Sequence, residues 1–301
     1  MRATIQLCTY NRAHLLERVL EACFEQTVPD DDYEVVLVDD GSTDHTPRVI
    51  ERAQAQARVR FIVVSQSNAG LARARNAGIA CARGERIIFI DDDVLPVPNF
   101  VEEHMRWHGN HPQAIVRGAV IKTHSFDALP PPIYSLRDFS ANYFWTSNVS
   151  VPLHRLRAVG AFNEDFAEYG WEDIELGLRL RFAGIPSLFN KKAVAFHYKP
   201  APDSENLHEM MRQARAQART AVQLARLHPH WRAYIATGNT IGHRVLHKWL
   251  RGVKASRYFG ALVSGPQKER PLRGKRLWAA RMLTAQSYYE ELERALAGKP
   301  M

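Results

Sequence analysis

Strand-like and helix-like segments alternate along the first 90 residues of this 301-residue chain. Four short apolar runs share an enrichment in Val, Ile and Leu and are found at residues 3–9, 33–40, 59–65 and 86–90. Segments with apolar residues at helical spacing separate them, at residues 13–26, 41–57 and 70–84. Regular alternation of this kind predicts a parallel, doubly wound α/β sheet with right-handed crossovers.

Polar clusters follow each of the four predicted strands, in the segments "CTYNR", "VDDGSTD", "SNAG" and "DDDV". The carboxyl ends of parallel strands meet at one edge of a sheet, which is where open α/β sheets bind their ligands. The chain contains neither a G-x-G-x-x-G segment after the first strand nor a phosphate-binding G-x-x-x-x-G-K-[ST] loop. The pattern therefore predicts a ligand crevice that is neither a dinucleotide fingerprint nor a P-loop.

Three consecutive carboxylates, Asp91, Asp92 and Asp93, follow the apolar strand at residues 86–90. Each like charge raises the free energy of ionising the next. Helix capping or solubility would explain one or two aspartates here, but three in a row favour a bound hard cation. Oxygen ligands suit Mg²⁺ or Mn²⁺, and Mg²⁺ is commonly held by one or two carboxylates together with substrate phosphates.

Five segments occur in a characteristic order: "TYNR", "VVLVDDGSTD", "NAGLARARNAG", "FIDDDV" and "GWEDIELGLRLRFAG". Over residues 3–198 they resemble glycosyltransferase family 2, whose GT-A fold enzymes use nucleotide sugars. The resemblance implies a Rossmann-like, mostly parallel sheet flanked by helices, with a C-terminal α-helical extension. The prolines of "HYKPAPDSEN", at residues 197–206, and a change in charge there mark a domain boundary, so a catalytic domain is predicted at residues 1–203, with a nucleotide-sugar-binding half at 1–96 and an acceptor half at 97–203. A basic helical region would then cover residues 204–301.

The resemblance also implies which residues bind the nucleotide sugar. They follow the first four strands or lie on the helix after the third, and are Thr9, Tyr10, Asn11, Asp39, Asp40, Asn68, Arg75, Asp91 and Asp92. Among them, Asp40 is expected to reach the base and Arg75 the diphosphate. The residues alone leave alternatives open, because Asp39 and Asp40 could instead cap a turn and Arg75 could be a solvated helix residue.

The same resemblance assigns the metal to the D-x-D pair, Asp91 and Asp93, with Asp93 as the direct ligand. Asp91 or Asp92 would serve the ribose or a metal-bound water. His197, after a short apolar strand, is expected as a further ligand and would favour Mn²⁺ over Mg²⁺. A structural role for His197 is the alternative.

Chemistry is expected at "WED", where the resemblance makes Asp173 the base that takes the acceptor proton and Glu172 the residue that holds the acceptor hydroxyl. Single in-line displacement would then invert the anomeric configuration. Gly170 and Trp171 are expected to form a turn that presents both carboxylates to the cleft. The alternative is an acidic first helical turn, which the helix dipole favours.

The acceptor side offers fewer signals. Trp145 and Trp171 could stack on sugar faces, since aromatic rings cover apolar C–H surface well, or could belong to the core. Residues 122–138 read as a long loop of the kind that closes over substrates.

The predicted function is a metal-dependent, inverting glycosyltransferase of the hexosyl or N-acetylhexosaminyl type. It would move a sugar from a nucleoside-diphosphate sugar to a glycan or lipid-linked acceptor in cell-surface or exopolysaccharide assembly. Two other classes remain as alternatives: a nucleotidyltransferase that makes a sugar nucleotide, and a non-catalytic nucleotide-binding module.

The C-terminal third differs in charge from the rest of the chain. Residues 201–301 carry 18 Lys and Arg against 7 Asp and Glu, whereas residues 1–200 carry 22 against 25. Helices are predicted at 205–227 and 241–263, each with an apolar and a basic face. They could pack on the catalytic domain or contact a membrane surface peripherally, and no nucleic-acid partner is expected. The absence of a signal-like apolar run predicts a cytoplasmic location, with contact at the inner membrane face as an option.

Overall fold

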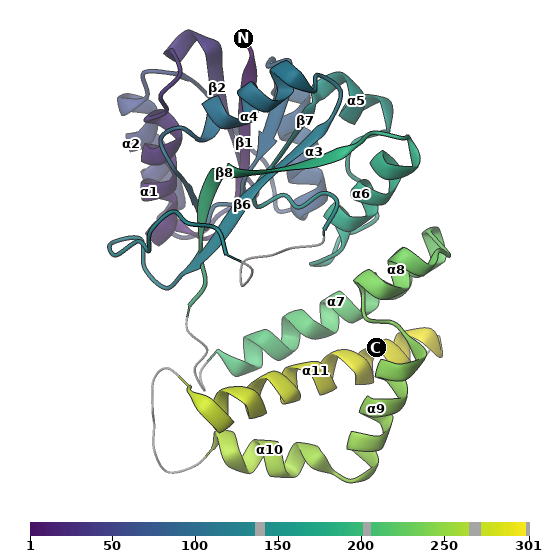
Figure 1. The fold of residues 1–301 in the computed structure, drawn as a ribbon. Coiled ribbons are helices and arrows are strands. Elements are labelled where there is room, and N and C mark those ends of the chain that lie inside the picture. Colours follow the sequence, from purple (N-terminus) through teal and green to yellow (C-terminus); the bar gives the residue numbers. More distant parts are fainter. Residues whose placement is uncertain (136–141, 201–205, 265–271, 299–301) are drawn as a thin grey trace. The chain divides into compact units, whose positions relative to one another are not determined.

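The computed structural model describes residues 1–135, 142–200, 206–264 and 272–298 (Figure 1). The chain forms two compact units: residues 1–167 with 172–199, and residues 168–171 with 200–301. The predicted boundary between residues 203 and 204 lies outside the described residues, as does the end of the predicted loop at 136–138.

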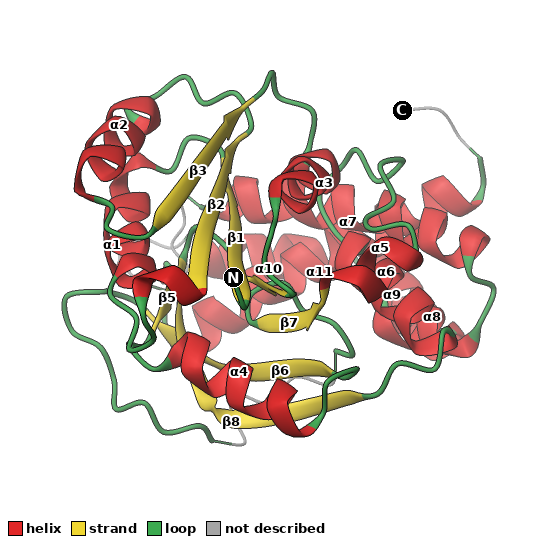
Figure 2. Ribbon diagram, turned by 90° about the horizontal axis from the view of Figure 1, so that it is seen from above, coloured by secondary structure: helices red, strands yellow, loops and turns green. Residues whose placement is uncertain are grey.

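The first unit is built on an eight-stranded sheet with the strand order β3-β2-β1-β4-β7-β6-β8-β5 (Figure 2). The strands are β1 (Ala3–Thr9), β2 (Tyr33–Asp39), β3 (Arg60–Ser65), β4 (Arg86–Phe89), β5 (Val94–Pro96), β6 (Ile115–Thr123), β7 (Val149–Pro152) and β8 (Ser187–Tyr198). The four N-terminal strands pair in parallel, as predicted from their alternation with helices. β6 and β8 are also parallel, while β7 pairs antiparallel with both β4 and β6, and β5 pairs antiparallel with β8.

Helices cover both faces of this sheet, which confirms the α/β class. They are α1 (Ala13–Phe24), α2 (Thr46–Gln56), α3 (Leu71–Cys81), α4 (Phe100–Asn110), α5 (Leu153–Ala158) and α6 (Glu172–Phe182), with a 3₁₀ turn η1 (Asp30–Asp32). Short apolar strands buried on both faces need such a double cover.

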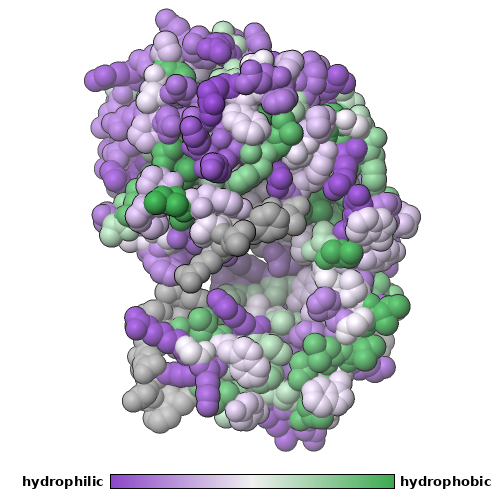
Figure 3. All heavy atoms as spheres, in the orientation of Figure 1, coloured by the Kyte–Doolittle hydropathy of each residue, from purple (hydrophilic) through white to green (hydrophobic). Residues whose placement is uncertain are grey.

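The second unit is helical among its described residues. It contains α7 (Leu207–Leu227), α8 (Trp231–Ala236), α9 (Ile241–Gly252), α10 (Ala255–Val263) and α11 (Gly274–Leu296). The single helix predicted at 241–263 is wrong: α9 and α10 are separate, and Lys254 between them has a φ of 53°. In Figure 3 hydrophobic residues, in green, gather at the lower right, where α9 lies in Figure 1.

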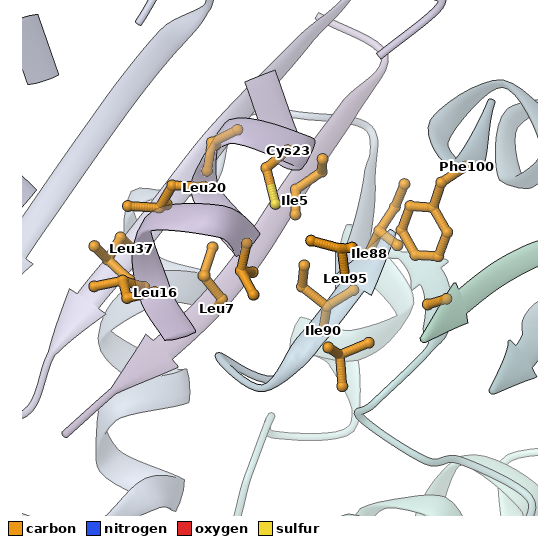
Figure 4. Close-up of a cluster of buried hydrophobic side chains, with 14 of the residues drawn as sticks. Ile5, Leu7, Leu16, Leu20, Cys23, Leu37, Ile88, Ile90, Leu95 and Phe100 are labelled. Carbon is orange, nitrogen blue, oxygen red and sulfur yellow. The ribbon is translucent and has the colours of Figure 1, made fainter. Parts of the chain in front are cut away.

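Two apolar clusters form the core of the first unit, one on each face of the sheet. The first joins α1, α2 and α4 to β1, β2 and β4 through side chains such as Ile5, Leu16 and Ile88 (Figure 4). The second joins α3, α5 and α6 to β4 and β7, with Phe89 at its centre. This double packing fixes the carboxyl ends of the strands, where the polar residues lie.

None of the described helices is both long and apolar enough to cross a lipid bilayer.

Candidate functional site

The carboxyl ends of β1, β2 and β4 place several predicted site residues side by side. Thr9 at the end of β1 pairs in register with Asp39 at the end of β2. The aspartates at 91–93 begin two residues beyond the end of β4, which lies on the other side of β1. Each of the three carboxylates has different partners, so the triplet divides into three distinct environments.

Asp92 points toward β1. The Thr9 hydroxyl donates a hydrogen bond of 2.8 Å to Asp92 Oδ2. Burial raises the pKa of Asp92 to about 7, the positive charge of Arg12 opposes this, and the neighbouring Asp93 and Asp91 add to it. Thr9 and Asp92, both predicted on the nucleotide side, are therefore in direct contact.

Asp93 points toward β8, where its Oδ1 lies 3.2 Å from His197 Nε2. Lys199 Nζ is 3.8 Å from Asp93 Oδ2. Burial alone would raise the pKa of Asp93, but the hydrogen bond and charge of His197, followed by Lys199 and Arg12, bring it below its ordinary value. Asp93 is therefore held as a carboxylate.

The predicted metal ligands are only partly gathered. Among the described residues, no three His, Cys, Asp or Glu side chains are grouped so that they could hold a metal ion. Asp93 and His197 are adjacent, and the buried Nδ1 of His197 has no hydrogen-bond partner in the described part of the chain. Asp91, the other predicted ligand, is engaged elsewhere: its Oδ2 accepts from the Ser147 hydroxyl at 2.6 Å and its Oδ1 from Arg75 at 3.2 Å.

Arg75 links the aspartate triplet to α6. Its guanidinium donates to Glu172 Oε1 at 2.6 Å, to Asp91 Oδ1 at 3.2 Å and to the Thr146 hydroxyl at 2.7 Å. The guanidinium carbon also lies 5.2 Å from the centroid of the Phe162 ring. Because Arg75 is only 4% exposed, the alternative that it is a solvated helix residue is wrong.

Glu172 and Asp173 begin α6. The two residues before them, Gly170 and Trp171, have φ values of 109° and 71°, so a tight turn leads into the helix as predicted. Glu172 is buried against Arg75, and Asp173 is half-buried beside it. Burial and the negative charge of Glu172 raise the pKa of Asp173 to about 7, while Arg75 limits the rise. A carboxyl group with this pKa can accept and release a proton near neutral pH.

Two residues predicted to bind the nucleotide, Asp39 and Asp40, also accept hydrogen bonds from neighbouring loops. Asp39 Oδ1 accepts from the Ser42 amide at 3.0 Å, which is the turn-capping role left open by the sequence. Asp40 accepts from the Ala69 and Gly70 amides and from Gln66, and so ties the loop before α3 to β2.

Asn11 has a similar bracing role, with a φ of 54°. Its side-chain oxygen accepts from the Thr43 amide at 2.7 Å and from the Asp44 amide at 3.2 Å. By contrast, Tyr10 and Asn68 are exposed, with 47% of Tyr10 accessible to solvent. The contribution of all five residues to nucleotide binding stays a prediction.

The two tryptophans differ. Trp145 is half-buried, its ring centroid lies 6.3 Å from that of His197, and it lines a hollow together with Tyr134 and Phe189. Trp171 belongs to the second unit, where it packs against the cluster on α7 and donates from Nε1 to the Gln217 carbonyl at 2.7 Å. Trp171 thus takes the core role that the sequence left open.

Three site residues escaped prediction. Thr146 and Ser147 hold Arg75 and Asp91, and Lys199 lies beside Asp93. Ser147 is 56 positions from Asp91 in the chain, so only the fold brings them together. The "KP" that follows "FHY" gave the sole local signal, a cation two residues after His197.

Comparisons with known proteins place the chain in a family. Residues 4–154 match the model of "Glycosyl transferase family 2". A validoxylamine A glucosyltransferase of Streptomyces hygroscopicus is 32% identical, and the match covers 63% of this chain and 54% of the relative. The uncharacterized glycosyltransferase YfnE of Bacillus subtilis is 25% identical, covering 70% of this chain and 68% of the relative. The chain spans about half the length of the first of these relatives.

Solved structures show the same fold. The mannosyltransferase PcManGT of Pyrobaculum calidifontis, in complex with GDP-Man and Mn²⁺, aligns with a TM-score of 0.65 at 19% identity, covering 99% of this chain and 88% of that one. S. aureus TarS 1–349 in complex with UDP aligns with a TM-score of 0.59 at 17% identity, covering 99% and 92%. The family match spans half of the chain, and the GT-A neighbours agree with the sheet observed. The chain therefore belongs to glycosyltransferase family 2.

Proposed function

We propose that this protein is a metal-dependent, inverting glycosyltransferase that moves a hexosyl or N-acetylhexosaminyl group from a nucleoside-diphosphate sugar to an acceptor hydroxyl. The observation that carries the proposal is the Arg75 guanidinium, which contacts both Glu172 of the "WED" segment and Asp91 of the aspartate triplet. The buried guanidinium thereby holds the "WED" segment, which carries the proposed base, at a fixed separation from the aspartate triplet, which carries the proposed metal ligands.

Asp173 is proposed as the general base. A sugar hydroxyl is a weak nucleophile, so its proton must be taken up as the new bond forms. Glu172 is held by Arg75, and burial together with the charge of Glu172 raises the pKa of Asp173 enough for its carboxylate to act near pH 7. Glu172 would also hold the acceptor hydroxyl. Attack from the face opposite the departing diphosphate inverts the anomeric centre.

Asp93 and His197 are the residues that would hold a divalent cation, Mn²⁺ or Mg²⁺. The observation that fits this role is a buried imidazole whose Nδ1 has no partner among the described residues and whose Nε2 faces a carboxylate held ionised. An imidazole nitrogen beside a carboxylate oxygen favours Mn²⁺ over Mg²⁺. When bound, such a cation supplies charge neutralisation for the leaving diphosphate. Asp91 stays part of this proposal as the second carboxylate of the D-x-D pair.

The donor class is proposed with support from relatives that carry GDP-Man, UDP or UDP-GlcNAc in their structures. A glycan or lipid-linked acceptor in cell-surface or exopolysaccharide assembly is proposed in the same way, since a chondroitin synthase of Pasteurella multocida is among the relatives, at 24% identity.

The test combines nucleotide binding with transfer. Thermal stabilisation by UDP, GDP, dTDP and CDP, with and without Mn²⁺, identifies the base, and the corresponding sugar nucleotides are then assayed for transfer. We expect Asp93→Ala to lose metal-dependent stabilisation. Asp173→Asn should keep it but lose at least about a thousandfold in transfer rate, because general-base catalysis and its electrostatics are both removed.

Asp165→Asn is the matched control, because Asp165 is an exposed aspartate in the loop between α5 and α6. It should retain both nucleotide binding and transfer. Transfer by Asp173→Asn at the wild-type rate would reassign the base, and metal-independent stabilisation in the wild type would remove Asp93 and His197 from the proposed metal site.

A further inference from the structure

Helix α9 turns its apolar side chains toward solvent. Ile241, Val245 and Trp249 recur every four residues on one stripe and are 81%, 61% and 62% exposed, and Leu246 beside them is 49% exposed. No residue of α9 is buried. A helix packed on a globular unit normally buries such a stripe against its neighbours. The stripe is therefore available to a partner outside the described chain.

The polar side of α9 packs inward instead. His247 stacks on Tyr289 of α11 with ring centroids 4.0 Å apart, and Arg251 pairs with Glu293 at 2.7 Å. Gln286 of α11 is buried, and neither its side-chain oxygen nor its nitrogen has a hydrogen-bond partner in the described part of the chain. The contacts of His247 and Arg251 with α11 hold the helix in an orientation that leaves its apolar stripe uncovered. The exposure of the stripe therefore follows from side-chain contacts within this unit.

The charges around the stripe select the partner. Residues 241–258 contain five Lys and Arg and no Asp or Glu. Lys248, Lys254 and Arg257 are exposed. A second copy of the chain docking on the same stripe would bring two such basic sets together, which like charges oppose. An anionic bilayer surface instead satisfies both components, since acyl chains cover the apolar stripe and lipid phosphates pair with the cations.

We propose that α9 is a membrane-surface helix that lies in the interface of an anionic lipid bilayer, with Ile241, Val245 and Trp249 toward the acyl chains. Lys248, Lys254 and Arg257 contact the lipid phosphates. The cytoplasmic leaflet carries the anionic lipids that attract such segments. This docking goes beyond the proposed transfer reaction and does not depend on it.

The experiment measures binding of the 301-residue chain to sedimented vesicles at low salt, with phosphatidylglycerol vesicles compared with phosphatidylcholine vesicles. We expect at least tenfold stronger partitioning onto phosphatidylglycerol. The double variant Val245→Ser with Trp249→Ser should lose at least tenfold, because it keeps every charge and removes two of the stripe's side chains. Ile133→Ser is the matched control, since Ile133 is 73% exposed in the other unit, and it should bind as the wild type does.

Lys248→Gln removes one positive charge and keeps the apolar stripe, so it measures the contribution of charge to vesicle binding. It should weaken binding to phosphatidylglycerol vesicles about fivefold. Ile241→Ser provides a second stripe variant should the double variant fold poorly, as judged by circular dichroism. Wild-type binding that is absent, or that the stripe variants leave unchanged, overturns the proposal. A dimer seen by light scattering without lipid would also overturn the proposal if the double variant Val245→Ser with Trp249→Ser dissociates it. The stripe would then be the contact between two copies of the chain.

Discussion

At the scale of single residues, Arg75 shows how a buried charge is tolerated. Its guanidinium meets two carboxylates and a hydroxyl, and Glu172, one of its partners, is only 6% exposed. Removing one member of a buried ion pair leaves the other uncompensated, which costs more than the pair itself contributes. The Arg75 contacts therefore matter for stability as well as for the site.

Arg75→Met should lower the free energy of unfolding by about 3–5 kcal/mol, because Glu172 is left buried without its cation. Arg75→Lys should fall between Arg75→Met and the wild type, since an ammonium group cannot reproduce the planar fork of donors. The matched control is Arg73→Met on the same helix. Arg73 has a 59% exposed side chain and a surface ion pair with Glu164, so about 1 kcal/mol or less is expected.

Urea denaturation followed by circular dichroism measures all three variants. Equal losses for Arg73→Met and Arg75→Met would contradict the view that burial, rather than ion pairing as such, makes Arg75 important.

At the scale of elements, α4 is joined to β7 by a buried polar cluster. His104 Nδ1 and His108 Nε2 lie 2.8 and 2.7 Å from the same Ser150 hydroxyl, and His104 Nε2 lies 2.9 Å from Asn148 Oδ1. Burial lowers the pKa of His104 to about 4 and that of His108 to about 3. Both imidazoles are neutral in the folded protein at neutral pH, although neither histidine showed a recognisable pattern in the sequence.

This cluster predicts acid lability. Since the unfolded chain protonates these histidines near pH 6.5 and the folded chain only near pH 4 and below, the stability they contribute is present above about pH 6.5 and is lost as the pH falls toward 4. Between pH 7 and pH 5 each histidine should cost about 2 kcal/mol of unfolding free energy.

Urea midpoints at the two pH values give the difference. His108→Gln should reduce it, whereas His14→Gln, at an exposed position, should leave it unchanged; an unaltered difference in His108→Gln would count against the idea.

Local pattern predicted the elements better than their partners. The apolar runs identified β1 to β4, because a strand buried on both faces needs a continuous apolar sequence. The antiparallel insertion of β7 beside β4 depends on long-range pairing that no local signal records. The spacing of apolar residues also predicted an apolar face on α9. Spacing does not show whether such a face points to the core or to solvent, so the exposure of this face was seen only in the structure.

The same distinction applies to the candidate site. The resemblance to the family was enough to name Asp93, His197, Glu172 and Asp173 from the sequence. In the structure they form two pairs, Asp93 with His197 and Glu172 with Asp173. Ser147 and Thr146 could not be named, because a hydroxyl becomes a site residue only through a contact made by the fold.

At the scale of the whole molecule, the ionisation of Asp173 acts on stability and on chemistry in opposite directions. The folded-state pKa of Asp173 is raised to about 7, so the stability linked to its neutral form is fully present below about pH 4, where the unfolded chain is also protonated, and is lost as the pH rises from there through 7. The same ionisation creates the proposed base. The histidine cluster meanwhile lowers stability below about pH 6.5, which leaves a working range at and above neutrality.

The second-order rate constant of transfer, kcat/KM, should therefore rise about tenfold per pH unit below pH 7 and level off above it, because only ionised Asp173 accepts the acceptor proton. Asp173→Asn does not titrate, whereas the wild-type aspartate ionises near pH 4 in the unfolded chain and near pH 7 in the folded chain. The unfolding free energy of the variant should therefore increase relative to that of the wild type by about 2–3 kcal/mol between pH 5 and pH 8. The two measurements, an initial-rate profile and paired urea titrations, probe one ionisation by independent routes. A pH-independent kcat/KM together with equal stability differences at both pH values would show that Asp173 does not titrate near neutrality, and the proposed base would then have to be sought elsewhere in the site.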